Sequence, residues 1–439
     1  MSMRGLPRAC RTVLVVAALL VILGPSRPDR HDFDIPDISR RINAFTADLL
    51  KVCARGDDLP ANAVLSPQSL FHCLAMSYVA SGGTTREELA RAFHFPDDDK
   101  ALLTALADLR RGLHDADRHD RIDVTVAQSL WLDETYATFR EDYVDRVREA
   151  FDAALHRVRF ARKAETSDAI NAWVARQTRG RITRSVLPED FDSLSGPGII
   201  NEPALVTVNA VYFKADWASR FDKQATRSRP FRLNASDAAE TPMMHQRSLL
   251  LYAENDTVKF LEIPYIDHQF SMVLLLPRDI VDIRDLLEEV TVDQCMALRR
   301  RAYEHTVDVL LPRFEMRGCL PARKALEALG VESAFGGRAD FERMIHRKLG
   351  ADSIYIREIH HDAWIDVHEE GTEAAAATST VHYSLGCSAS PGPTPVEFHA
   401  DHPFLFMIVH NASRSVLFAG WISDPRALEQ QEAAAEAGP

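Results

Sequence analysis

The chain has 439 residues, a net charge of −13 at neutral pH and 46% hydrophobic residues. The acidic balance argues against nucleic acid as a main partner, and an aromatic share of 8% argues against general disorder. The length is large for one domain, but a single α/β or α+β fold can reach it.

The first 26 residues have the pattern of an export signal peptide. Arg4, Arg8 and Arg11 precede an apolar run at 13–23, which is too short for a membrane span of ~20 residues. We expect cleavage near 24–26, although no Ala-x-Ala site defines it. A secreted, extracellular protein is predicted, and an uncleaved membrane anchor is the alternative.

Helical periodicity dominates the first half of the chain. Apolar residues recur every three or four positions over 37–54 and 167–178. Ser66-Pro67 opens a further helix, because serine is a good N-cap and proline suits the first helical turn.

The body of this further helix, 68–79, is apolar on nearly every side, so we expect a central, buried helix. Ser81-Gly82-Gly83 ends it, and Thr84 begins another helix with a capping sequence, Thr-Thr-Arg-Glu-Glu-Leu.

Strands dominate the second half. Segments rich in β-branched and aromatic residues lie at 205–214, 270–277, 307–311, 353–368, 404–410 and 416–422. They do not alternate regularly with helices, which disfavours a doubly wound parallel sheet. The pattern predicts a mixed α+β fold with large sheets.

The most informative stretch is 369–385, which reads Glu-Glu-Gly-Thr-Glu-Ala-Ala-Ala-Ala-Thr-Ser-Thr-Val-His-Tyr-Ser-Leu. Glycine supplies a hinge. The small residues after it fit a crowded sheet, where proline would remove a ladder hydrogen bond and charge would cost desolvation free energy. The segment can therefore be an exposed loop and can also become a buried central strand.

This stretch resembles the reactive-centre loop of inhibitory serpins. Further motifs resemble serpin landmarks in family order over roughly 38–425: Asn62-Ala-Val-Leu-Ser-Pro, Asn171-Ala-Trp-Val, Val208-Asn-Ala-Val-Tyr-Phe-Lys-Ala-Asp-Trp, Leu311-Pro-Arg-Phe and Phe398-His-Ala-Asp-His-Pro-Phe. The resemblance implies a serpin fold with mixed sheets, about eight or nine helices and an exposed loop at about 369–396. The serpin domain is expected at 27–425, after the export signal or uncleaved anchor at 1–26. The Ala/Glu/Gln run after it lacks large apolar residues to pack, so a disordered tail is expected at 426–439.

The resemblance also implies a function, a suicide-substrate inhibitor of serine proteases that traps the acyl-enzyme when its cleaved loop inserts into the main sheet. Insertion of this kind is a known form of strand addition. The hinge implied by the family consists of Glu369, Glu370, Gly371, Thr372, Glu373, Ala374, Ala375, Ala376, Ala377 and Thr378.

In the family register the side chains that turn inward on insertion are small and uncharged, namely Thr372, Ala374, Ala376, Thr378 and Thr380. A non-inhibitory serpin that acts as carrier, chaperone or protease substrate is the alternative, and this inward set speaks against it.

The family spacing places the scissile bond sixteen residues after Glu369, between Leu385 and Gly386; the bond between Tyr383 and Ser384 is the alternative register. Leucine fits a deep apolar primary pocket, so chymotrypsin-like, cathepsin-G-like or subtilisin-like targets are expected. Residues 374–396 contain no Arg or Lys, which argues against trypsin-like targets.

Five residues match positions where the serpin main sheet opens. Ser66, Ser69, Asn209 and His361 correspond to the family's shutter cluster, and Trp217 matches the position where the loop first enters the sheet. Polar groups buried in such a cluster must hydrogen-bond to one another. Ordinary helix caps, a satisfied core histidine and a core tryptophan are the structural alternatives.

Two other chemistries are less consistent with the sequence. Ser388 follows Gly386-Cys387 but lacks the complete Gly-x-Ser-x-Gly elbow, so we do not expect an enzyme. His360, Asp362, Asp366 and His368 alternate along one strand, yet this spacing is no metal-ligand signature, and neither metal nor cofactor is expected.

The remaining expectations concern partners and modification. The target protease, held in a covalent acyl complex, is the expected partner of a monomer. Arginines at 110–121 alternate with aspartates, so no strong glycosaminoglycan site is expected. Sequons begin at Asn234, Asn255 and Asn411, and Cys387 in the loop is expected to be an ordinary free thiol.

Overall fold

The computed structural model describes residues 36–56, 59–116, 121–191, 205–289, 292–348, 354–372 and 394–428. The chain divides into two compact units, Met1–Pro36 and Asp37–Pro439. The description below concerns the second unit. Among the described residues, no helix is long and apolar enough to cross a membrane.

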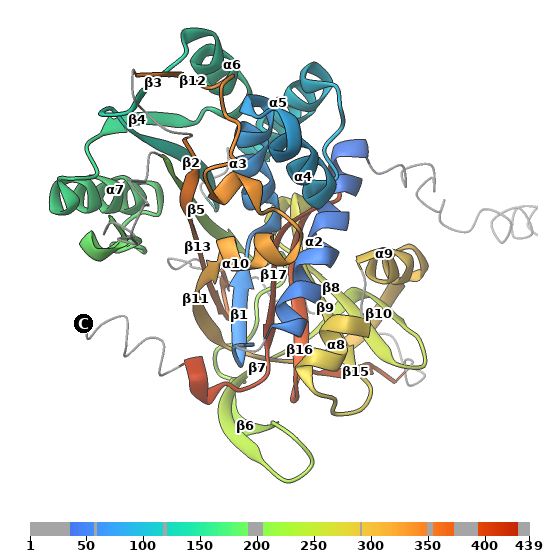
Figure 1. Cartoon of the computed structure of the whole chain (residues 1–439). Coiled ribbons are helices and arrows are strands. Elements are labelled where there is room, and N and C mark those ends of the chain that lie inside the picture. Colours follow the sequence, from blue (N-terminus) through green and yellow to red (C-terminus); the bar gives the residue numbers. More distant parts are fainter. Residues whose placement is uncertain are drawn as a thin grey trace, which may run out of the picture. The chain divides into compact units, whose positions relative to one another are not determined.

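Nine α-helices lie in the described part of the second unit (Figure 1). Their bounds are α2 Asp37–Arg55, α3 Pro67–Ala80, α4 Gly83–Phe93, α5 Asp99–Ala116, α6 Glu141–Phe151, α7 Lys163–Gln177, α8 Ile283–Glu289, α9 Val292–Arg301 and α10 Ala322–Ala328.

Helix α3 forms as the sequence predicts. The Ser66 hydroxyl accepts a hydrogen bond from the backbone N–H of Ser69, Pro67 occupies the first turn, and every residue of the helix is buried. This helix packs on strands of both large sheets, namely β2, β5 and β17, whose bounds are given below. It is therefore the central helix of the unit.

One sheet has nine strands, in the order β1-β17-β16-β9-β8-β7-β10-β15, with β6 paired to β7. Their bounds are β1 Asn62–Leu65, β6 Arg227–Arg232, β7 Ala238–Glu254, β8 Val258–Pro264, β9 Phe270–Pro277, β10 Tyr303–Pro312, β15 Val396–His399, β16 Phe404–His410 and β17 Ser415–Ile422.

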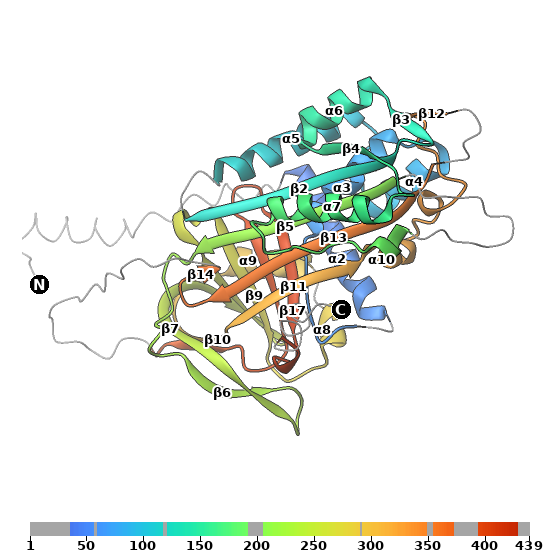
Figure 2. The ribbon, with the colours of Figure 1, turned by 90° about the vertical axis from the view of Figure 1, so that its left-hand side faces the viewer.

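The second large sheet has six strands, in the order β11-β13-β14-β5-β2-β4. Their bounds are β2 Ile122–Asp133, β4 Ala154–Val158, β5 Leu205–Asp216, β11 Phe314–Pro321, β13 Ile356–His368 and β14 Gly371–Thr372; β3 Ala137–Phe139 and β12 Ile345–Arg347 form a small sheet of their own. Figure 2 shows β2, β5, β13 and β11 side by side, with α7 lying in front of them.

Each face of the six-stranded sheet has its own core. Val211, Phe213 and Ala215 of β5 face the nine-stranded sheet in the larger apolar cluster. The alternate residues of β5, such as Val208 and Ala210, pack against the apolar stripe of α7 in a second cluster. The period of two along β5 therefore assigns each side chain to one face.

The predicted α+β class with mixed sheets is confirmed, since both large sheets contain parallel and antiparallel pairs. The bounds of β9 and β16 agree with the predicted strands 270–277 and 404–410.

One local prediction was wrong: helix α4 begins at Gly83 after Gly82, without a side-chain cap, and the Thr85 hydroxyl accepts a hydrogen bond from the backbone N–H of Asp340. The first half is mainly helical, as predicted, and also contains the 12-residue strand β2, which was not predicted. Leu428, inside the predicted tail 426–439, is buried in the larger core because its side chain finds apolar neighbours there.

Candidate functional site

The six-stranded sheet is divided along the seam between β5 and β13. Over most of its length these two strands pair directly and in parallel, as far as Trp364 and Tyr212. Beyond that point the two-residue strand β14 lies between them and pairs antiparallel with both. One end of the seam therefore already holds the first residues of a third strand.

Gly371 is required at this position by a close backbone approach. Its φ is +157°, and a Cβ atom added to it would lie 2.2 Å from the carbonyl oxygen of Ala215 and 2.5 Å from Cα of Asp216. Because both obstructing atoms belong to the backbone of β5, no side-chain movement can relieve the overlap. Glycine here permits β14 to pair with β5.

Thr372 is fully buried on the inner face of the sheet. It lies opposite Ala215 on one side and Val367 on the other, and its hydroxyl is 3.0 Å from that of Tyr265. Tyr265 stacks on Trp217 with the ring centroids 4.4 Å apart. Burial raises the pKa of Tyr265 well above its usual value, so its phenol stays neutral and can donate to Thr372.

Backbone hydrogen bonds hold the segment that leads into β14. The indole Nε1–H of Trp217 donates to the carbonyl of His368 at 2.8 Å. The backbone N–H of Trp217 donates to the carbonyl of Glu370, and that of Phe221 to the carbonyl of Glu369. Trp217 therefore holds the hinge through two hydrogen bonds, one from its indole and one from its backbone N–H. These bonds distinguish it from a tryptophan that only fills the core.

The two hinge carboxylates are bound differently. Glu369 is buried, and its carboxylate accepts a hydrogen bond from the Thr226 hydroxyl at 2.8 Å. Glu370 forms an ion pair with Lys223 at 2.6 Å, in which the lysine side chain is 63% exposed. The first contact is internal to the fold, whereas the second is a surface ion pair of small expected energy.

A cavity of about 810 Å³ borders the hinge. Its wall includes Glu369, Glu370 and His368 from the hinge and Lys223 and Arg313 from neighbouring segments. The hinge is therefore accessible from this side.

Four of the predicted residues form one buried network further along the seam, in the middle of the stretch where β5 and β13 pair directly. The backbone N–H of Ser66 donates to Nε2 of His361 at 3.0 Å, so Nδ1 must carry the proton that it donates to Oδ1 of Asn209 at 2.9 Å. Nδ2 of Asn209 donates to the Ser69 hydroxyl, and the Ser66 hydroxyl donates to the carbonyl of Leu417. The network joins β13, β5, the start of α3 and β17.

Burial lowers the pKa of His361 to about 4. At neutral pH the ring is uncharged, as its two hydrogen bonds require. Protonation of Nε2 would place a proton against the N–H of Ser66, so it would break the bond between β13 and α3.

A second polar group lies beside this network. The carboxylate of Asp362 is buried and binds Arg317 of β11 at 2.8 Å; it also accepts a hydrogen bond from the Ser185 hydroxyl. Asn171 of α7 fixes the same loop through the backbone N–H groups of Ser185 and Val186. Helix α7 is thereby connected to the seam by polar contacts as well as by its apolar stripe.

Two of the residues considered for a metal site have other contacts. Asp362 is bound by Arg317, and the backbone carbonyl of His368 accepts the indole N–H of Trp217. Among the described residues, no group of three or more His, Cys, Asp or Glu side chains is arranged to hold a metal ion.

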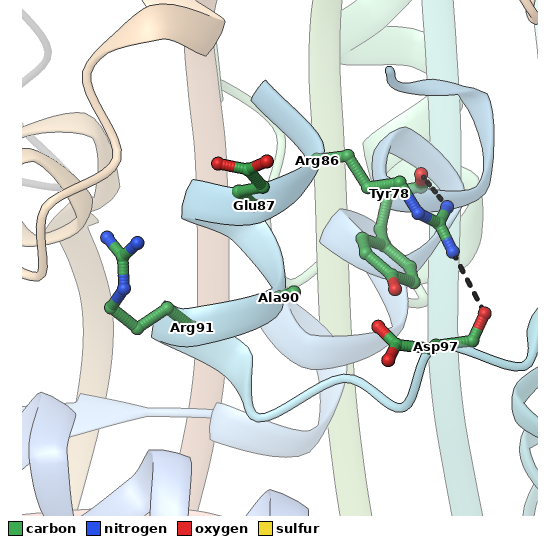
Figure 3. A pocket seen from close by; sticks show the side chains of 6 residues that line it. All are labelled: Tyr78, Arg86, Glu87, Ala90, Arg91 and Asp97. Atoms are coloured by element: carbon green, nitrogen blue, oxygen red, sulfur yellow. Dashed lines mark hydrogen bonds between the residues drawn. The ribbon is translucent and has the colours of Figure 1, made fainter. Parts of the chain in front are cut away.

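A smaller cavity of about 400 Å³ lies at α4, remote in sequence from the hinge (Figure 3). Arg86 lies across the ring of Tyr78 and donates to the backbone carbonyls of Tyr78 and Asp97. Its guanidinium also binds Asp99 at 2.6 Å. These contacts stabilise the link between α3, α4 and α5.

The structure divides the predicted residues into two groups. Trp217 lies with Glu369, Glu370, Gly371 and Thr372 at one end of the seam. The second group, Ser66, Ser69, Asn209 and His361, lies in the middle of the directly paired stretch. The remaining predicted residues lie outside the described part of the chain. They are Glu373, Ala374, Ala375, Ala376, Ala377 and Thr378 of the predicted hinge and Tyr383, Ser384, Leu385 and Gly386 of the two candidate scissile bonds.

Sequence reasoning missed the contacts of Tyr265, Thr226 and Lys223 with the hinge. Tyr265 belongs to an Ile-Pro-Tyr motif, which could have drawn attention to it, but nothing in the motif names Thr372 as its partner. Thr226 and Lys223 lie in a polar stretch without a recognisable pattern.

Fold and seam together define a class of α+β protein whose six-stranded sheet holds a two-residue strand, β14, between β5 and β13. A sequence model described as Serpin (serine protease inhibitor) matches residues 40–425. The leukocyte elastase inhibitor of Homo sapiens is 34% identical over 403 residues, which cover 87% of this chain and 97% of that protein.

The leukocyte elastase inhibitor of Xenopus laevis is 31% identical over 397 residues, covering 89% of this chain and 100% of that protein. The crystal structure of uncleaved ovalbumin superposes with a TM-score of 0.74 at 25% identity and covers 88% of this chain and 100% of that one. The chain therefore belongs to the serpin family, whose members of this kind are protease inhibitors and not enzymes.

Proposed function

We propose that the protein is a suicide-substrate inhibitor of chymotrypsin-like, cathepsin-G-like or subtilisin-like serine endopeptidases. The target serine attacks the carbonyl carbon of Leu385, the peptide bond to Gly386 breaks, and the new amine of Gly386 leaves with a proton from the protease histidine. The protease remains attached as an ester. The cleaved loop then inserts into the seam between β5 and β13 before water can hydrolyse that ester.

The observation that carries this proposal is the register of β14. Thr372 lies opposite Ala215 of β5 and Val367 of β13. Six residues further along an extended β14, Thr378 would lie opposite Asn209 of β5 and also opposite His361 of β13. Asn209 and His361 already pair with each other.

For every β13 residue from Glu358 to Trp364, counting from Thr372 along β13 and along its partner positions on β5 leads to the same loop residue. The two strands can therefore accept a third strand by separating by one strand spacing, about 4.8 Å, without sliding past each other.

The side chains agree with this path. Thr372 is on the inner face, so every second residue after it would face inward, namely Ala374, Ala376, Thr378 and Thr380. These side chains are small and uncharged, so they add little volume and no buried charge to the core. Thr378 would enter the position where Asn209 and His361 now bond each other.

The energetics favour insertion once the loop is cut. A dozen new strand residues, each contributing ~1 kcal/mol net from backbone pairing, sum to as much as the stability of an ordinary domain. The uncleaved protein is then a kinetically trapped state whose loop is held by its attachment at Val396.

The direct test is to mix the purified protein with chymotrypsin and run a denaturing gel. A detergent-stable band near the summed mass, together with a released fragment that begins at Gly386, is the expected result. Cleavage without a stable band would favour the non-inhibitory alternative, a serpin acting as carrier, chaperone or substrate. A fragment that begins at Ser384 would move the scissile bond to Tyr383.

The proposal extends to compartment and partners. We infer export through residues 1–26, an extracellular location and a monomer without a strong glycosaminoglycan site. In support of the last point, Arg110 donates to backbone carbonyls of α6, and Arg111 and Arg121 bind Asp108 and Asp216. Heparin at physiological salt should therefore leave the inhibition rate unchanged within about twofold.

Glycosylation should depend on the free amide nitrogen of each sequon. Nδ2 of Asn411 donates to the carbonyl of His268 and to Ser271, so a glycan there would displace two bonds. In Asn234 and Asn255 the side-chain oxygen caps a turn through backbone N–H groups. We therefore expect glycans, if any are added, at Asn234 and Asn255 and not at Asn411.

A further inference from the structure

The cavity beside the hinge has an uneven charge. Its wall contains four carboxylates, Glu315, Asp366, Glu369 and Glu370, and two cations, Lys223 and Arg313. His368 also lines the cavity, but burial lowers the pKa of its imidazole, which is therefore mostly uncharged at neutral pH. Four carboxylates against two cations leave an excess of two negative charges in the wall.

Glu369 carries one of these charges at a buried position. The residue is 6% exposed, and its carboxylate accepts a hydrogen bond from the neutral Thr226 hydroxyl at 2.8 Å. No lysine or arginine of the described residues forms an ion pair with it. A buried carboxylate costs free energy unless a cation or several donors compensate it. A cation that enters the cavity would supply what the surrounding chain does not.

A second buried polar group lines the same cavity. Thr241 of β7 is 4% exposed and belongs to the cavity wall, and no hydrogen bond joins its hydroxyl to another described residue. A buried hydroxyl normally has a partner. Because a threonine oxygen has two lone pairs, Thr241 can accept a hydrogen bond from a ligand that also binds Glu369.

The remaining wall combines negative charge with apolar surface. Glu315 of β11 and Asp366 of β13 lie directly opposite each other, and like charges in this arrangement destabilise a sheet. A cation between these two carboxylates would relieve their repulsion. Phe314 and Leu428, which are 3% and 6% exposed, also belong to the wall. Their apolar surface suits a hydrocarbon chain better than a hydrated ion.

Size and ligand geometry define the kind of cation. The volume of about 810 Å³ lies within the range of small-molecule sites. Among the described residues, no group of His, Cys, Asp or Glu side chains is arranged to hold a metal ion. An alkylammonium group, in contrast, carries three N–H donors and needs no fixed coordination geometry.

We propose that this cavity binds an aliphatic polyamine, with one ammonium group on Glu369 and Thr241 and another between Glu315 and Asp366. The inference does not rest on the proposed function, because every residue that it uses belongs to the folded, uncleaved chain. The carbonyls of Glu369 and Glu370 also accept the backbone N–H groups that fix the hinge. A ligand on Glu369 therefore stabilises the hinge in its present position.

The test is a calorimetric titration of the whole protein with spermidine at low ionic strength. We expect one saturable site. The isosteric variants Glu369→Gln and Glu315→Gln should each weaken binding about tenfold, as for loss of a charge-assisted hydrogen bond, and Thr241→Val about threefold. Glu304→Gln is the matched control, because Glu304 is exposed on β10 and does not line the cavity. It removes the same charge and should leave binding unchanged.

Hydrogen exchange supplies a second measurement. With spermidine at ten times its Kd, the Trp217 and Phe221 amides, which donate to the hinge carbonyls, should exchange about tenfold more slowly. The Glu315→Gln and Thr241→Val variants keep the inference testable if Glu369→Gln does not fold. Absence of saturable binding, an equal loss in Glu304→Gln, or displacement of spermidine by an equal concentration of Mg²⁺ would each overturn the inference.

Discussion

The hinge end of the seam between β5 and β13 and the shutter network in its middle hold the strands in different ways. At the hinge end a third strand is already present, fixed by hydrogen bonds from Trp217 and Phe221 and by the buried Thr372. At the shutter β5 and β13 pair directly, and one neutral histidine joins them to α3.

Under the proposed insertion, opening the sheet would be a local exchange of partners that proceeds from the hinge towards the shutter. The hinge end has the geometry that the whole seam would acquire on insertion. The experiments below weaken one of these two regions at a time, in order of decreasing expected effect.

Thr372→Arg should have the largest effect. The position is fully buried, and an unpaired charge there costs several kcal/mol, so the hinge should leave the seam and insertion should not begin. We expect the yield of stable complex with chymotrypsin to fall about a hundredfold, measured as band intensity on a denaturing gel. Thr372→Ser keeps the hydroxyl for Tyr265 and should retain most of the yield; equal loss in both variants would contradict the role of burial.

Acid should weaken the shutter. Burial lowers the pKa of His361 to about 4, below the unfolded value of about 6.5. The unfolded chain therefore binds more protons between these values, so the contribution of His361 to stability is complete above pH 6.5 and is lost as pH falls towards 4. Its full size is about 3 kcal/mol.

His361→Gln isolates this contribution from that of the other buried histidines. Glutamine can offer one donor and one acceptor but does not titrate, whereas His72 and His410, whose pKa values burial also lowers to about 4, remain in both proteins. Denaturant unfolding at pH 7.5 and 4.5 should show a smaller loss of stability in the variant. The same loss in both proteins would rule out His361 as a titrating contact.

Gly371→Ala should release the hinge without adding charge. Its Cβ would meet the backbone of Ala215 and Asp216, at a cost of about 2 kcal/mol. Hydrogen exchange of the Trp217 and Phe221 amides, which donate to the hinge carbonyls, should become about thirtyfold faster. Gly336→Ala, where a Cβ meets nothing within 4 Å, is the control and should leave both amides unchanged.

Lys223→Ala should have the smallest effect. The lysine is 63% exposed in its ion pair with Glu370, and solvent screens such a pair to less than about 1 kcal/mol. The same two amides should exchange no more than about twofold faster at low salt, with no difference at high salt. A change as large as that of Gly371→Ala would mean that charge, and not backbone pairing, holds the hinge.

Local chemistry made part of the fold predictable. The Ser66-Pro67 start of α3 follows from capping and from the fixed φ of proline. The strands at 270–277 and 404–410 follow from their continuous apolar sequence between turns. In contrast, β7 is the longest strand of the described residues and was not predicted. Its sequence mixes Met, His, Gln and Arg, which have no strong preference for a strand. Pairing with β10 makes this segment a strand.

The candidate site was predictable in its members but not in its geometry. The family motif named Gly371 and Thr372, yet only the structure shows that they already pair with β5 and β13. The tautomer of His361 depends on Ser66, 295 residues away in the sequence. No local pattern can predict a contact of that separation.

The sequence by itself determined which residues can form strands and helices, and it determined that the stretch after Gly371 is small enough to enter a sheet. Those properties belong to single residues and their near neighbours, which is why they can be read without a fold. Tertiary structure decided the matching register of β5, β13 and β14 and the burial of Thr372 beside Tyr265. Each of these depends on segments that only the folded chain brings together, where burial converts a missing partner or an overlapping atom into a free-energy difference.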